Sequence, residues 1–126
     1  FKDQLGYWEF IKSINQSKFT FLPNTMDASP RTLTESLCLN KPVLVNKNII
    51  GGWKYVNRNT GEFFSDENDL RENLSYLLDN YSNYQPRKYF YDNYGPKIYG
   101  PKLEKFIRSH YPNFTKCTSA EPYCCD

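Results

Sequence analysis

The stretch FTFLPNTMDASPRTLTESLCLNKPVLV, residues 19–45, decides the fold class of this chain. Its two ends, Phe19 to Leu22 and Pro42 to Val45, are short apolar runs of the kind that form buried strands in parallel sheets. Between the two runs, apolar residues recur at helical spacing; the residues of this expected buried face are Leu33, Leu37 and Cys38. A strand, a helix and a second strand in this order predict an α/β fold.

The ends of this helix carry recognisable signals. Ser29 can cap its N-terminus, with Pro30 at the first helical position, where the missing N–H group costs nothing. Asn40 is suited to the stop at the C-terminus because asparagine tolerates a left-handed backbone. We therefore expect the helix to begin near residue 30 and to end before residue 40.

The flanking segments extend the same pattern. Helical spacing of apolar residues predicts a helix from about residue 4 to 15, and a turn at 59–61 precedes a strand from Glu62 to Phe64. Ser65 and Asp66 then begin a capped helix, whose apolar stripe is Leu70, Leu74, Leu77 and Leu78. The expected fold is a partial Rossmann-like parallel sheet of about three strands flanked by helices.

The sequence after Tyr81 is rich in tyrosine and punctuated by proline. It predicts two short helices, at about 86–94 and 101–110; the expected inward residues of the second are Leu103, Phe106 and Ile107. The predicted organisation is an α/β part at 1–80, C-terminal helices at 81–115 and a cysteine-containing tail at 116–126.

Composition limits the possible partners and compartments. The chain has 126 residues and a net charge of +2, with both signs distributed along it, so the overall charge favours neither nucleic acid nor an anionic membrane. No apolar run is long enough to span a bilayer, and residues 1–10 lack the order of a signal peptide. We expect a soluble protein, cytoplasmic in the first instance, with a secretory compartment left open. Because the first residue is Phe1, we also expect an upstream portion.

The four cysteines do not follow a metal-binding pattern. Cys38 is expected on the apolar side of a helix, whereas Cys117, Cys124 and Cys125 lie in the tail and could form a disulfide only in an oxidising compartment. No metal site is predicted. The lone His110 is expected at a helix end on the surface.

Two acids mark the candidate site. Asp27 and Glu35 have seven residues between them, one in the loop and one in the helix that follows. The N-terminus of this helix, beyond the carboxyl end of a parallel strand, is suited to an anionic ligand.

This region resembles the nucleotide-binding half of GT-B glycosyltransferases of the group 1, GT4-like kind. The resemblance rests on the acid pair, on Lys41-Pro42-Val43-Leu44-Val45, on Gly51-Gly52 and on Thr60-Gly61-Glu62-Phe63-Phe64, and it covers roughly two-thirds of the chain. It implies that residues 1–80 bind a nucleotide-diphosphate sugar as donor substrate, without a metal or other cofactor. It also implies a retaining transfer of the sugar to an acceptor.

The resemblance assigns a role to each candidate residue. Asp27 and Glu35 are the implied catalytic acids: Glu35 accepts hydrogen bonds from the ribose hydroxyls and Asp27 from the donor sugar. The implied donor-binding residues are Ala28, Ser29, Arg31, Glu35, Gly51 and Gly52. Asp27 is shorter than the usual glutamate, and Pro30 removes an amide donor. Simple capping by Asp27 and Ser29, a solvated Glu35 and Arg31, and a plain turn at Gly51-Gly52 remain alternative interpretations.

An acceptor domain and the first half of the nucleotide domain have no counterpart in these residues. The chain is therefore expected to need an upstream acceptor domain or a partner, or to self-associate through the edge of its first strand. The alternative hypothesis is a transferase-derived domain that no longer catalyses and serves in binding or assembly. The nucleotide, the sugar and the acceptor cannot be deduced from these residues.

Overall fold

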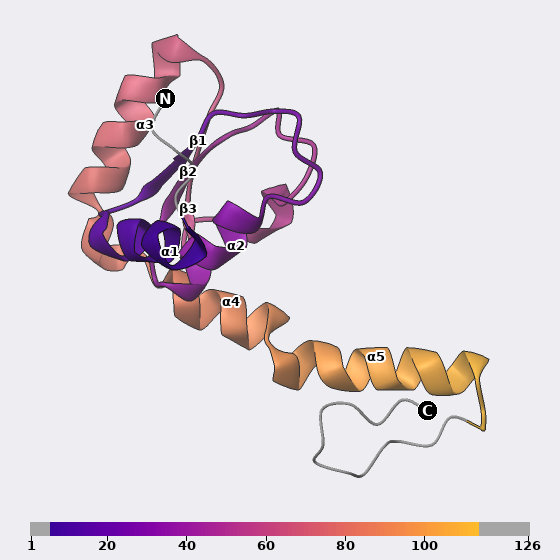
Figure 1. Cartoon of the computed structure of the whole chain (residues 1–126). Helices are drawn as coiled ribbons and strands as arrows, with labels where there is room; N and C mark the ends of the chain where they lie inside the picture. Colours follow the sequence, from indigo (N-terminus) through magenta and orange to yellow (C-terminus); the bar gives the residue numbers. More distant parts are fainter. Residues whose placement is uncertain (1–5, 114–126) are drawn as a thin grey trace. The chain divides into compact units, whose positions relative to one another are not determined.

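Three short strands form one parallel sheet in the computed structural model, which describes residues 6–113. The strands are β1 (Thr20–Leu22), β2 (Val43–Asn46) and β3 (Gly61–Phe64), hydrogen-bonded in the order β1-β2-β3. The register aligns Phe21 with Leu44 and Leu44 with Glu62. The predicted α/β fold, a partial Rossmann-like sheet of three parallel strands with helices on its faces, is confirmed (Figure 1).

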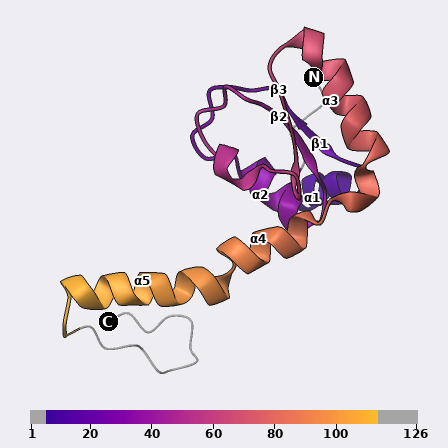
Figure 2. The same ribbon diagram turned by 180° about the vertical axis from the view of Figure 1, so that it is seen from behind.

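Helices alternate with these strands along the chain. They are α1 (Tyr7–Gln16), α2 (Arg31–Cys38), α3 (Glu67–Asp79), α4 (Pro86–Tyr94) and α5 (Pro96–His110), with 3₁₀ turns η1 (Trp53–Tyr55) and η2 (Tyr81–Asn83). α2 covers one face of the sheet and α3 covers the other, as Figures 1 and 2 show from opposite sides. α1 packs against α2. No helix within residues 6–113 has the length and apolar character needed to cross a membrane.

Two apolar clusters hold the sheet between its helices. Val43 and Val45 of β2 face α2, and Leu44 faces α3; all three side chains are at most 1% exposed. Such burial on both faces is the physical reason why β2 is apolar without alternation. In the α2 cluster the other buried members are Leu22, Leu33, Leu37, Ile49 and Val56; in the α3 cluster they are Phe64, Leu77 and Tyr84.

The helix boundaries test the capping signals. Asp66 caps α3 as predicted, its carboxylate accepting from the Asn68 N–H at 2.7 Å. Asn40 follows the end of α2 with φ 60°, the left-handed conformation expected of a helix stop. The prediction that Ser29 caps α2 is wrong, because Pro30 is the N-cap and α2 begins at Arg31. Instead, the carboxylate of Asp27 accepts a hydrogen bond from the Ser29 N–H, and Ser29 belongs to the loop before α2.

The outer edge of β1 has no partner strand among the described residues. Thr20 and Leu22 bond toward β2, so the N–H and C=O groups of Phe21 point away from the sheet in a parallel ladder. The Phe21 ring is 44% exposed and packs against Phe64 with 5.3 Å between ring centroids. β1 is thus an open edge, as the sequence predicted.

Two compact units divide the chain, and the division falls within the C-terminal helices. The first unit extends to Asn93 and the second starts at Tyr94. α4 belongs to the first unit: Arg87 Nε donates to the Cys38 carbonyl oxygen at 2.7 Å, and Phe90 meets Tyr55. Cys38 itself is only partly buried. The expected tail with Cys117, Cys124 and Cys125 lies outside the described residues.

α5 differs from its predicted form in two ways. It begins at Pro96, five residues earlier than expected, with Pro101 inside the helix. The expected inward stripe is also wrong: Leu103 and Phe106 are each 59% exposed, and α5 buries no residue. Helical spacing alone does not say whether an apolar stripe finds a surface to cover. His110 does lie exposed at the helix end, its Nδ1 2.9 Å from the Phe106 carbonyl oxygen.

Candidate functional site

The loops that follow β1 and β2 meet beyond the carboxyl ends of these parallel strands. The Ile50 N–H donates to the Thr25 carbonyl oxygen at 3.1 Å, which ties one loop to the other. Gly51 is buried directly against the backbone of Ala28: a Cβ atom at Gly51 would lie 2.7 Å from Ala28 Cα and closer still to its carbonyl group. Only glycine allows this approach, so Gly51 joins the loops rather than forming a plain turn.

Gly52 continues this junction and turns the chain toward η1. Its φ of +75° lies in the left-handed region, and a Cβ atom there would lie 2.6 Å from Pro30 Cγ. Both glycines therefore bring the second loop against the start of α2. The resemblance grouped these glycines with the residues of the first loop, and the structure brings the two sets together.

A shallow groove of about 290 Å³ opens where the loops meet. Its lining residues are Ala28, Ser29, Pro30, Arg31, Thr34, Gly52, Lys54 and Tyr55. Four residues predicted for donor binding thus share one hollow: Ala28, Ser29, Arg31 and Gly52. The groove lies at the N-terminus of α2 and at the carboxyl ends of β1 and β2, where open α/β sheets bind their ligands.

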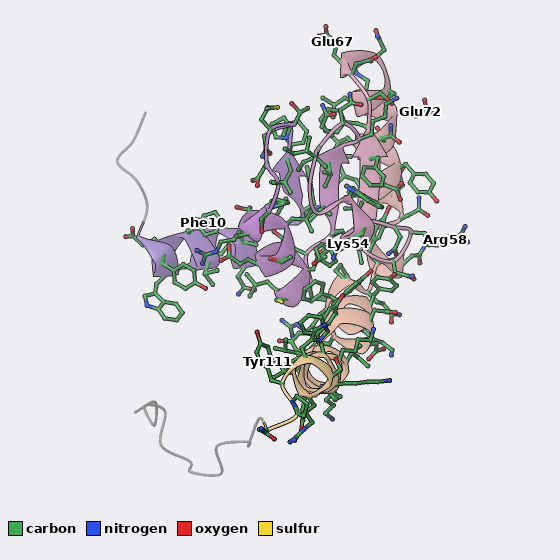
Figure 3. All side chains as sticks on the ribbon, turned by 90° about the vertical axis from the view of Figure 1, so that its right-hand side faces the viewer. Phe10, Lys54, Arg58, Glu67, Glu72 and Tyr111 are labelled. Atoms are coloured by element: carbon green, nitrogen blue, oxygen red, sulfur yellow. The ribbon has the colours of Figure 1, made fainter. Side chains whose placement is uncertain are left out.

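The charge at the groove is positive. The Arg31 side chain is 80% exposed, and Lys54, labelled in Figure 3, stands on η1 with Nζ 4.9 Å from the Tyr55 ring centroid. The N-terminus of α2 carries no side-chain cap, so its first N–H groups and the helix dipole add positive potential. Two cations and a helix N-terminus favour an anionic ligand.

Asp27 makes hydrogen bonds within the loop that leads to the groove. Its Oδ1 accepts from the Ser29 N–H at 3.0 Å, and its Oδ2 lies 3.4 Å from Asn24 Nδ2. Asp27 does not line the hollow, although the Ser29 and Ala28 next to it do. Its carboxylate thus fixes the conformation of the residues that do line the hollow.

Glu35 lies one helical turn beyond Arg31 and pairs with it. The distance from Arg31 Nη2 to Glu35 Oε1 is 3.5 Å, and the Glu35 side chain is only 18% exposed. Glu35 is therefore not a freely solvated residue, yet it does not line the hollow itself.

Cys38 lies one helical turn after Glu35. Burial raises the pKa of this thiol above its ordinary value; the positive charge of Arg87 lowers the pKa, and the negative charge of Glu35 raises it further. The Cys38 thiol is thus not an activated nucleophile.

Four residues of the groove were not predicted from the sequence: Pro30, Thr34, Lys54 and Tyr55. Pro30 was expected at the first helical position and as a lost amide donor, but its ring lies against Gly52 at the groove. Lys54 and Tyr55 follow the glycine pair by two and three residues. The glycine pair was therefore the sequence signal that could have assigned these two residues to the site. Thr34 lies one turn after Pro30 on the same side of α2, and its hydroxyl donates to the Arg31 carbonyl oxygen at 2.9 Å.

Comparisons with models of protein families, with curated proteins and with solved structures returned no match to this chain. Within residues 6–113, no three His, Cys, Asp or Glu side chains gather as a metal site would require. The fold and the groove define a class: an α/β protein with a positively charged hollow at the carboxyl ends of its parallel strands.

Proposed function

We propose that this chain is the donor-binding portion of a nucleotide-sugar-dependent glycosyltransferase, retaining and metal-independent, which needs an acceptor domain or a partner polypeptide. One observation carries the proposal: four of the six residues that the resemblance assigned to donor binding line the groove at the start of α2. Ala28 and Ser29 reach it from the loop after β1, Arg31 from the start of α2, and Gly52 from the loop after β2.

The size of the groove agrees with a partial site. Pockets for small molecules commonly have volumes of roughly 300 to 1,000 Å³. The groove, at about 290 Å³, is just below this range. It suits the diphosphate and an adjoining sugar rather than a whole nucleotide sugar. The open edge of β1 supports the need for further polypeptide, because a strand with exposed backbone groups invites pairing.

The proposed chemistry is electrostatic. A sugar leaves its nucleotide as negative charge accumulates on the diphosphate, and fixed cations and amides stabilise that charge. Arg31 would hold the diphosphate through its planar guanidinium group, together with Lys54 and the first amides of α2. Glu35, which pairs with Arg31, would orient this side chain and accept the ribose hydroxyls. Asp27 would support the loop that meets the donor sugar.

Calorimetry of the 126-residue chain with nucleoside diphosphates and the matching nucleosides tests this proposal. We expect the diphosphates to bind more tightly than the nucleosides. Glu35→Ala should cost about 1.5 to 3 kcal/mol of diphosphate affinity, since a charge-assisted hydrogen bond is lost. Arg31→Ala should weaken the diphosphate without a comparable effect on the nucleoside.

A matched control exists in α5. Glu104 and Arg108 form an i, i+4 ion pair of the same residue types as Arg31 and Glu35 in the reverse order, with 3.0 Å between Arg108 Nη2 and Glu104 Oε1. Arg108→Ala and Glu104→Ala should leave diphosphate affinity unchanged. The donor-site assignment is contradicted if no nucleoside diphosphate binds at millimolar concentration, or if the Arg31 and Glu35 variants behave as the controls do.

A second candidate is a transferase-derived domain that binds but does not catalyse. The use of the Asp27 carboxylate within its own loop favours it, because a group that holds Ser29 and Asn24 is less available to a sugar. The two candidates differ in their response to the sugar. Tighter binding of a nucleotide sugar than of its nucleoside diphosphate, lost in Asp27→Ala, supports the transferase; equal binding of the two supports the binding domain.

A further inference from the structure

The second unit presents an apolar helix face that no other described residue of this unit covers. Tyr99, Leu103, Phe106 and Ile107 follow the i, i+4, i+7, i+8 spacing of one side of α5. Leu103 and Phe106 are each 59% exposed and Tyr99 is 44% exposed. In α3 the same spacing places Leu77 at 0% exposure against the sheet. The stripe on α5 has the same form, but no other described residue of the second unit covers it.

Most charged residues of α5 are basic. Lys97, Lys105 and Arg108 lie on the side opposite the stripe, given 3.6 residues per turn. Lys102 borders the stripe, with Nζ 5.4 Å from the Tyr99 ring centroid. Glu104 is the only acidic residue of α5, and it pairs with Arg108. Figure 3 views α5 nearly along its axis, with side chains projecting around it.

We propose that α5 binds to an anionic lipid surface, with Leu103 and Phe106 inserted into the interface and the lysines directed at the headgroups. Helices that lie in a membrane interface combine an apolar face bearing leucine and aromatic residues with a Lys/Arg-rich polar face. α5 has both, and its charge complements an anionic surface. Long lysine side chains beside the stripe can reach the headgroups while their methylene groups stay at the apolar boundary.

The charge of the whole chain conceals this feature. The net charge of +2 over 126 residues does not by itself favour an anionic membrane as partner. However, α5 places four basic residues and one acidic residue within fifteen positions. Because electrostatic attraction is screened over about 10 Å, the local charge determines binding to a surface. The proposal concerns α5 alone and stands whether or not the groove binds a nucleotide.

Co-sedimentation of the full chain with vesicles tests the proposal. The vesicles contain either phosphatidylcholine alone or phosphatidylcholine mixed with phosphatidylserine. We expect binding to the anionic vesicles that weakens as salt is raised. The double variant Leu103→Glu/Phe106→Glu should lose more than about tenfold in affinity. Lys97→Glu and Lys105→Glu should each lose at least about fivefold.

Matched substitutions in the first unit serve as controls. Tyr76→Glu replaces a 55% exposed aromatic residue of α3, and Arg58→Glu reverses an exposed charge; both should leave vesicle binding unchanged. Circular dichroism verifies that all variants stay folded. We expect them to fold, because the substituted α5 side chains are not buried.

Three results would overturn the proposal. The first is an absence of vesicle binding, or equal binding to neutral and anionic vesicles. The second is unaltered binding by the Leu103→Glu/Phe106→Glu variant. The third is self-association without vesicles that this variant abolishes, because the stripe would then be covered by protein.

Discussion

Replacement of Gly51 by alanine should disrupt the junction of the two loops at the groove. The added Cβ atom would lie 2.7 Å from Ala28 Cα and nearer to the Ala28 carbonyl group, all of it backbone that cannot rotate away. The loops must therefore separate, which strains the Ile50 to Thr25 hydrogen bond. Forcing atoms into a packed site costs about 1 to 3 kcal/mol. For a unit of this size that corresponds to a fall in Tm of roughly 5 to 20 °C.

Thermal unfolding followed by circular dichroism measures this effect, with Gly100→Ala as the control. Nothing lies within 4 Å of a Cβ atom at Gly100, which is inside α5, so alanine there should be neutral or slightly stabilising. Calorimetry on Gly51→Ala at low temperature should show weaker diphosphate binding, because the separated loops widen the groove. A Gly51→Ala protein with the Tm and affinity of the original chain would show that the loops do not meet at Gly51.

Arg31→Lys should weaken a nucleoside diphosphate more than a nucleoside in calorimetry, since the planar fork is lost while the charge stays; equal effects would leave Arg31 a surface residue. Leu77→Ala should cost about 2 to 5 kcal/mol in urea denaturation, because the side chain is fully buried against the sheet. Hydrogen bonds from the Ser65 backbone lower the pKa of Asp69 below 3.8, so the charged carboxylate stabilises the fold above that pH and loses its effect as pH falls through the folded pKa. Asp69→Asn should therefore lose more stability at neutral pH than well below pH 3.8, and a pH-independent loss would contradict this. The open β1 edge should cause self-association in sedimentation; a monomer with a slowly exchanging Phe21 amide would argue against it.

The first unit could be predicted well because its signals are local. Apolar runs as short as those at β1 and β2, bounded by turn residues, favour strands, and Asp66 at the start of α3 accepts a hydrogen bond from an N–H group within the same turn. Asn40 stops α2 for an equally local reason, its tolerance of a positive φ. The prediction failed at Ser29, where two local solutions compete: a serine cap or an aspartate turn. The sequence does not show which of the two the tertiary contacts favour.

The candidate site was only partly predictable, because some of its residues come together through tertiary contacts. Asp27, Ala28, Ser29, Arg31 and Glu35 are close in the sequence, so a shared location was a local inference. Lys54 and Tyr55 belong to the groove only because Gly51 lets another loop approach. The positions of the two acids were not predictable in the same way. Both Asp27 and Glu35 lie outside the lining of the hollow.

The amino-acid sequence by itself determined the alternation of strands and helices, the parallel sheet and the presence of an apolar stripe on both α3 and α5. These properties depend on periodicity and on the conformational preferences of single residues, which act over one or two turns. Only the tertiary structure decided which stripe is buried. Leu77 packs against a sheet, whereas Leu103 and Phe106 stay exposed on a helix of equal amphipathic form. Burial requires a surface that another part of a polypeptide supplies, and no residue within the helix encodes where that surface lies.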